Sequence, residues 1–106
     1  MSIIEANKID SIGTDKLTGE VILTISDHLD WKDDDLHLET LQNKLNSYIE
    51  FIEGEQIFEA YPNSRNKKII IEIISKYEYN ESGNQFLMDI KPIIESLGVK
   101  IRQKHI

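Results

Sequence analysis

The sequence predicts an α+β fold of two layers, in which a four-stranded mixed sheet carries two main helices on one face. Short runs of β-branched residues alternate with two longer segments whose apolar residues recur every three or four positions. Glycine, proline and asparagine stand between these segments, where turns and helix ends are expected. The resulting order is β-β-α-β-α-β, and right-handed crossovers place both helices on the same face. A chain of 106 residues in this order is expected to form a single domain, residues 1–106.

The first two strands are predicted to form a hairpin. Residues 7–13 have a weak strand pattern, and residues 14–19 contain the aspartate and glycine that suit a turn. Residues 20–27 alternate with a period of two, which is typical of a half-buried strand. The inward positions of this strand are Val21, Leu23 and Ile25.

The strongest helical pattern covers residues 34–53. Asp33 or Asp34 can cap its start, and Gly54 ends it. A short second helical piece is predicted over residues 55–61, up to Pro62. The core-facing stripe of the long helix consists of Leu38, Leu41, Leu45, Tyr48, Ile49 and Ile52.

The second half of the chain is predicted as strand, helix and strand. Residues 67–78 have β-branched residues on both faces for most of their first half, as in a central strand. The final helix starts at Asn80 or Ser82, contains Pro92 and ends before Gly98, and residues 99–105 form the last strand. We expect the strand order 1-2-3-4, with strands 2 to 4 parallel and strand 1 antiparallel at an edge; the alternative inserts strand 1 between strands 2 and 3.

The net charge of −7 is unevenly distributed. Residues 1–60 hold 14 acidic and 4 basic side chains, whereas residues 61–106 hold 5 and 8. This balance opposes nonspecific binding to nucleic acid or to an anionic membrane. The chain has no cysteine, no apolar run long enough to span a membrane and no signal-peptide pattern, so we expect a cytoplasmic protein.

The stretch from Ser26 to His37 concentrates the unusual chemistry. Histidine nitrogens and carboxylate oxygens could bind a metal, and Asp33 and His37 are spaced i, i+4, but the spacing matches neither the calcium loop Asp-x-Asp-x-Asp-Gly nor His-Glu-x-x-His. Aspartates at this point also cap a helix start, and Trp31 can either anchor that start or offer an exposed contact to a partner. We expect no catalytic residue, no metal and no cofactor here. The candidate functional surface is Asp27, His28, Asp30, Trp31, Asp33, Asp34 and His37.

The sheet face turned away from the helices is the second candidate surface. It mixes apolar with charged side chains, so it can be solvated or can form a homodimer. It lacks the aromatic side chains on which open-faced sheets stack RNA bases, so no nucleic-acid binding is expected. Its predicted members are Ile22, Thr24, Ser26, Ile70, Glu72, Ile74, Lys76, Lys100, Arg102 and Lys104.

Several short motifs are distributed over nearly the whole chain. They are Ser26-Asp27-His28-Leu29-Asp30-Trp31, then His37-Leu38-x-x-Leu41-Gln42-x-Lys44-x-Asn46-x-Tyr48-x-x-Phe51-Ile52-Glu53, then Tyr61-Pro62 and Lys76-Tyr77-Glu78. With these motifs the chain resembles a family of small bacterial proteins of unknown function. The resemblance implies a bacterial cytoplasmic origin and no particular activity.

Two functional hypotheses follow. The first is a non-enzymatic binding or accessory module, of an immunity-like kind, whose acidic surface from Asp30 to Glu59, or whose outer sheet face, binds another protein. The second is an enzyme that binds a metal or a small ligand around His28, Asp30 and His37.

Overall fold

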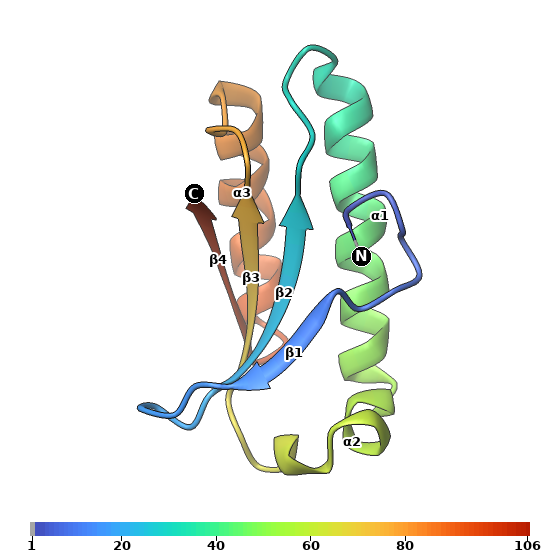
Figure 1. Ribbon diagram of the computed structural model, residues 1–106, viewed down its shortest axis with the longest axis vertical. Coiled ribbons are helices and arrows are strands. Elements are labelled where there is room, and N and C mark those ends of the chain that lie inside the picture. Colours follow the sequence, from blue (N-terminus) through green and yellow to red (C-terminus); the bar gives the residue numbers. More distant parts are fainter. Residues whose placement is uncertain (1) are drawn as a thin grey trace.

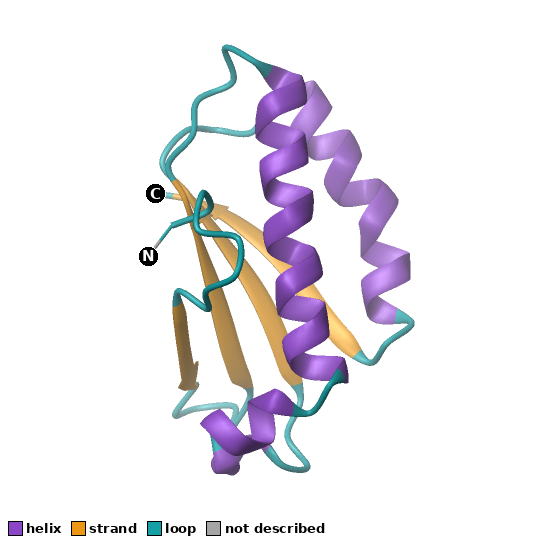
Figure 2. Cartoon of the chain, turned by 90° about the vertical axis from the view of Figure 1, so that its right-hand side faces the viewer, coloured by secondary structure: helices purple, strands orange, loops and turns teal. Residues whose placement is uncertain are grey.

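The computed structural model describes residues 2–106 as a sheet covered on one face by two long helices (Figures 1 and 2). The predicted fold class and the predicted strand order β1-β2-β3-β4 are confirmed. In chain order the elements are β1 (Ser11–Thr14), β2 (Val21–Asp27), α1 (Asp34–Glu53), α2 (Gln56–Ala60), the 3-10 turn η1 (Pro62–Ser64), β3 (Ile69–Ser75), α3 (Glu81–Glu95) and β4 (Val99–His105).

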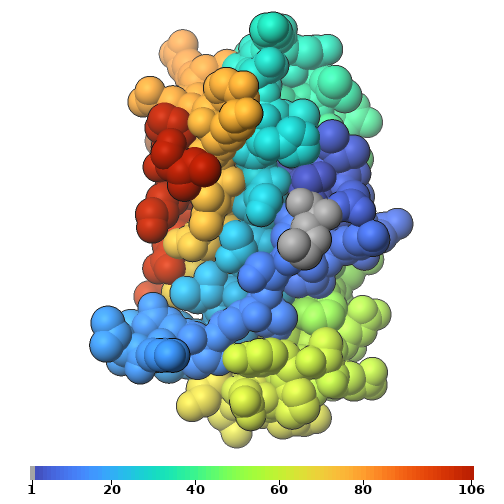
Figure 3. Space-filling model, in the orientation of Figure 1, coloured from blue at the N-terminus to red at the C-terminus, as the bar shows by residue number. Residues whose placement is uncertain are grey.

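The sheet pairs as the sequence predicted. Strand β1 is antiparallel to β2, while β2, β3 and β4 are mutually parallel. In the register of the three parallel strands, Asp27, Ser75 and His105 lie side by side at their carboxyl ends. The face turned away from the helices is seen in Figure 3, where the side chains of β4, β3 and β2 lie uncovered by any helix.

Helix α1 has the bounds expected from its sequence pattern. Asp33 is the N-cap, and its carboxylate accepts the Leu36 N–H at 3.1 Å. At the other end, the Gly54 N–H donates to Glu50 O at 2.8 Å. Helix α3 begins after the cap Asn80 and includes Pro92 near its end.

Two predicted strands are longer than the observed ones. Strand β1 begins at Ser11 and not at residue 7, because the Asp10 carboxylate takes the Ser26 N–H, at 2.9 Å, in place of a strand hydrogen bond. Strand β3 ends at Ser75, so Tyr77 and Tyr79 do not share a strand face: Tyr77 is exposed and Tyr79 is buried.

The core lies between the sheet and the helices. It is built from the inward side chains of the strands and the apolar stripe of α1, with Ile57 of α2 and Ile94 of α3. Within residues 2–106, no helix is both long enough and apolar enough to cross a membrane.

Candidate functional site

A buried polar cluster lies at the carboxyl end of β2 and is formed by Asp27, His37 and Tyr79. Asp27 occupies an inward position of the strand, so its side chain points toward α1. His37 Nε2 lies 2.7 Å from Asp27 Oδ2, and the Tyr79 hydroxyl donates to the same oxygen at 2.5 Å. Only 2% of Asp27 and 1% of His37 are exposed, so the ion pair is closed to solvent.

Both ring nitrogens of His37 face hydrogen-bond acceptors. Nδ1 lies 3.0 Å from the backbone oxygen of Asp30, and Nε2 faces the Asp27 carboxylate. The second Asp27 oxygen accepts the Leu29 N–H at 3.1 Å. Both ring nitrogens of His37 therefore have hydrogen-bond partners within the fold. Buried and with both nitrogens in contact with the fold, the ring does not face a substrate or a metal ion.

Tyr79 completes the cluster as a permanent donor. Burial raises the pKa of its phenol far above the usual value, and the negative charge of Asp27 raises that pKa further. The hydroxyl therefore stays protonated and keeps its bond to Asp27.

Trp31 closes the cluster on one side. Its indole stacks on the His37 ring with centroids 3.7 Å apart and meets the Tyr79 ring edge-on at 5.0 Å. Gly83 of α3 lies against the same indole, where an added Cβ would be 2.7 Å from its ring carbons. Trp31 thus packs as an anchor between the start of α1 and the start of α3.

The carboxylates at the start of α1 have structural partners. Asp33 caps α1. Asp34 joins the two helices, since its two oxygens accept from Asn80 Nδ2 and from Ser82 Oγ, each at 2.9 Å. Asn80 in turn caps α3 through the Gly83 N–H at 3.0 Å. Asp34 therefore holds the starts of the two helices together, whereas Asp33 acts within α1.

His28 and Asp30 are exposed on the loop after β2, whereas His37 is buried beneath it. Asp30 caps its own loop by accepting the Lys32 N–H at 3.1 Å. Among residues 2–106, no group of three or more histidine, aspartate or glutamate side chains is placed to hold a metal ion. The three residues proposed for a ligand site therefore do not form one concave set of free ligand atoms.

A second buried cluster centres on Lys44, which the candidate surface predicted from sequence does not include. Its Nζ donates to Asp10 Oδ1 at 2.8 Å and to the backbone oxygens of Glu5 and Lys8, each at 2.7 Å. The helical spacing could have identified Lys44 as a buried residue, because it lies three residues after Leu41 in the apolar stripe of α1.

Tyr48 extends this cluster from the next turn of α1. Its hydroxyl accepts the Asp10 N–H at 2.8 Å and donates to Thr24 O at 2.5 Å. Burial raises the pKa of this phenol above its usual value, so it too remains a neutral donor. The N-terminal segment is thereby fixed along α1.

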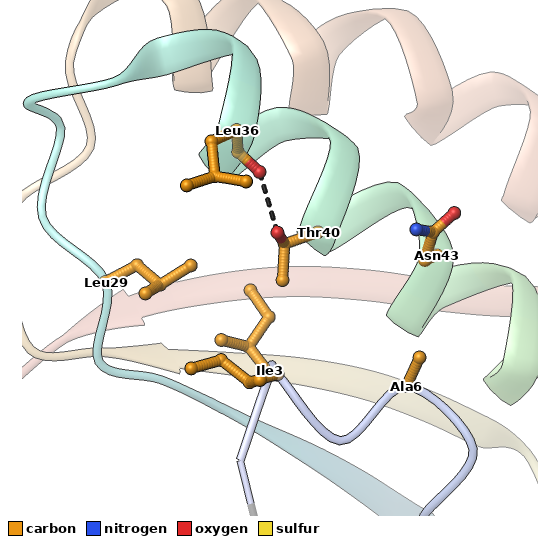
Figure 4. A pocket seen from close by; sticks show the side chains of 7 residues that line it. Ile3, Ala6, Leu29, Leu36, Thr40 and Asn43 are labelled. Carbon is orange, nitrogen blue, oxygen red and sulfur yellow. Dashed lines mark hydrogen bonds between the residues drawn. The ribbon is translucent and has the colours of Figure 1, made fainter.

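Between that segment and α1 lies an apolar pocket of about 300 Å³ (Figure 4). Ile3 and Ala6 come from the N-terminal segment, Leu29 from the loop after β2, and Leu36 from the first turns of α1. Ile4 is 61% exposed and Leu36 is 57% exposed. The complete lining of the apolar pocket is Ile3, Ile4, Ala6, Leu29, Leu36, Thr40 and Asn43.

Along the chain, acidic residues lie close to residues that line this pocket. Asp30 follows Leu29, and Asp33 and Glu39 lie three residues before and after Leu36, which places them on neighbouring positions of the helix surface. All three are exposed, against one exposed cation, Lys32, in the same loop. Residues that line the apolar pocket therefore have exposed acidic residues as near neighbours along the chain.

A family model described as "Family of unknown function (DUF6572)" matches residues 1–106. The chain belongs to this family. No curated protein and no solved structure matches it. The DUF6572 assignment agrees with the resemblance to a family of unknown function, while the bacterial origin stays a prediction. DUF6572 has no known activity to transfer to these residues, so function has to be argued from the geometry.

Proposed function

We propose that this chain is a non-enzymatic protein-binding module, and that its apolar pocket binds a hydrophobic side chain from a basic segment of another protein. The exposure of Ile4 and Leu36 around an open hollow is the observation that carries the proposal. Large apolar side chains that stay in water on both sides of a hollow are typical of contact sites.

The pocket is large enough to admit a side chain of a partner. At about 300 Å³ it is at the lower end of the range for small-molecule sites, which run from about 300 to about 1,000 Å³. An aromatic or aliphatic anchor can enter such a space, and anchors of this kind carry most of the energy of protein interfaces.

The charge around the pocket selects the partner. The exposed carboxylates Asp30, Asp33 and Glu39 favour lysine or arginine next to the anchoring side chain. The acidic half of the chain, residues 1–60, extends this potential and speeds the encounter with a basic partner.

The enzyme hypothesis gains no support from the geometry. Its best acid–base candidate, His37, is buried and uses both ring nitrogens within the fold. We therefore propose only the protein-binding function.

The test is affinity capture from a lysate of the source cells with three immobilised proteins, the wild type, Leu36→Ser and Leu17→Ser. Leu17 is 96% exposed in the turn between β1 and β2, so its variant controls for the loss of an exposed leucine. We expect Leu36→Ser to weaken the affinity for the captured partner at least about tenfold, whereas Leu17→Ser changes it by less than about twofold.

The captured protein is then purified, and its affinity is measured at low and high salt. We expect binding to weaken with salt and the bound segment to be basic. Equal capture by all three proteins, or a bound segment that is acidic, contradicts the proposal.

We also propose that the protein acts in the cytoplasm of a bacterium, in line with the sequence resemblance and the absence of cysteine. Cell fractionation with an antibody against the chain tests the location. Recovery in a membrane or secreted fraction contradicts it.

A further inference from the structure

Strand β4 has an open edge on the side away from β3, at the left of the sheet in Figure 1. It runs over seven residues, and no strand within residues 2–106 pairs with that side. The opposite edge strand, β1, has only four residues. An open edge of the length of β4 can accept another strand through its unpaired backbone groups.

The direction of those backbone groups follows from one hydrogen bond. The Ile106 N–H donates to Ser75 O of β3 at 3.1 Å. Because successive N–H groups point to opposite sides of a strand, the N–H groups of Ile101, Gln103 and His105 point to the open side. Three donors are thus available at known positions.

The side chains of β4 differ on the two faces of the sheet. Lys100, Arg102 and Lys104 are exposed on the face away from the helices, and Arg102 Nε donates to Glu72 Oε2 at 2.6 Å. A strand added at this edge would place alternate side chains next to these cations. Carboxylates are the favourable neighbours for them.

On the helix side, the same edge opens into a hollow of about 310 Å³ between α3 and β4. Met88 of α3 is 69% exposed beside it. The other alternate side chains of an added strand would enter this hollow, which suits apolar residues. The lining of the hollow is Leu87, Met88, Lys91, Ile101, Arg102 and Gln103.

We propose that β4 binds an extended segment of another protein, in which carboxylates alternate with apolar residues, by adding it as a fifth strand. Backbone hydrogen bonds supply affinity. Lys100, Arg102 and Lys104 contact the side chains on one face of the added strand, and the hollow accepts those on the other face. A second copy of β4 fits less well, because antiparallel pairing would bring its lysines and arginine next to the same residues of the first copy. The open edge of β4 is separate from the apolar pocket. Its exposed side chains are cationic, whereas the exposed residues near the pocket are acidic.

The test uses a synthetic peptide, Glu-Val-Glu-Val-Glu-Val-Glu, which has the length of β4. Amide hydrogen exchange is measured residue by residue by NMR, with and without the peptide. We expect slower exchange at Ile101, Gln103 and His105, whose N–H groups face the open edge. A peptide with lysine in place of glutamate should bind at least about tenfold more weakly.

Two pairs of variants sharpen the test. Gln103→Pro removes one outward N–H, whereas Gln103→Ala removes the same side chain, with its 2.6 Å bond to Ser75, and keeps the N–H. We expect the proline variant to bind at least about tenfold more weakly than the alanine variant. Lys100→Glu with Lys104→Glu should weaken binding about fivefold, and Lys67→Glu with Lys68→Glu, the same charge change in the loop before β3, less than about twofold.

The proposal is overturned if the glutamate peptide does not bind, if the lysine peptide binds equally well, or if protection appears away from β4. Protection of the same three amides on raising the protein concentration alone would assign the edge to a second copy instead. Should Gln103→Pro fail to fold, the charge-reversal pair still decides the outcome.

Discussion

Two buried polar clusters, one around Lys44 and one around His37, contain the same three kinds of group in different parts of the fold. Each places a carboxylate beside a basic side chain and adds a tyrosine hydroxyl. The Lys44 cluster fixes the N-terminal segment on α1, and the His37 cluster fixes the loop after β2 beneath Trp31. The same trio of groups therefore occurs both at the carboxyl edge of the sheet and away from it.

A buried histidine–aspartate pair at a strand end is therefore not by itself evidence of a catalytic site. In both clusters, the groups bond to each other and to backbone atoms of the chain. They secure the segments that carry Ile3, Ala6 and Leu29 and so shape the apolar pocket between them. The clusters hold the pocket in place, and the exposed side chains around it make the contacts.

The largest expected effect comes from removing the buried ammonium in Lys44→Met. The change leaves the Asp10 carboxylate without its cation and removes one donor from each of two backbone oxygens, so we expect a loss of about 3 to 5 kcal/mol in the free energy of unfolding. Urea denaturation measures it. Gln42→Ala, at an exposed position of the same helix, should change stability by less than about 0.5 kcal/mol. A loss below about 1 kcal/mol for Lys44→Met would show that the cluster is not a fold anchor.

A smaller effect is expected at the other cluster from Gly83→Ala. The added Cβ would stand 2.7 Å from the Trp31 ring and 2.9 Å from the Tyr79 ring, so the indole must shift, at a cost of about 1 to 3 kcal/mol. Thermal unfolding measures the cost, and near-ultraviolet circular dichroism reports the displaced tryptophan. Gly13→Ala is the matched control, because its Cβ meets nothing within 4 Å. Equal stability of both variants would mean that Trp31 does not pack tightly on α3.

The third expected effect is a loss of stability that begins only above pH 10. Burial raises the pKa values of Tyr48 and Tyr79 above the usual value of 10.0, so the folded state holds protons that the unfolded chain releases. This stabilisation is complete below pH 10 and is lost as pH rises further, by roughly 1 kcal/mol per pH unit for each tyrosine. Urea denaturation at a series of alkaline pH values measures the slope, and Tyr48→Phe and Tyr79→Phe should each reduce it. A slope that neither variant changes contradicts this account.

The fold was predictable because its signals are local. The alternation in residues 20–27 and the spacing in residues 34–53 each fix which side of an element is buried. Asp33 and Gly54 mark the ends of α1 in both the sequence and the structure. Parallel pairing and right-handed crossovers then leave few arrangements of four strands.

The candidate site was only partly predictable. The period of two places Asp27 on the inward side of its strand, and the helical stripe includes Lys44, so two buried charges could have been inferred. Their partners could not, since the contact of Asp27 with Tyr79 spans 52 positions and that of Lys44 with Asp10 spans 34. The apolar pocket depends in the same way on how the N-terminal segment folds back over α1.

We propose that the buried polar residues, such as Asp27 and His37, hold the fold, while the apolar pocket binds the partner. It is tested most directly by partner capture with Asp27→Asn, at a temperature at which circular dichroism shows the variant to be folded. We expect Asp27→Asn to lower the free energy of unfolding and to capture the partner as well as the wild type does. Leu36→Ser should instead lose capture and keep its stability. Loss of capture by folded Asp27→Asn, with normal capture by Leu36→Ser, would contradict it.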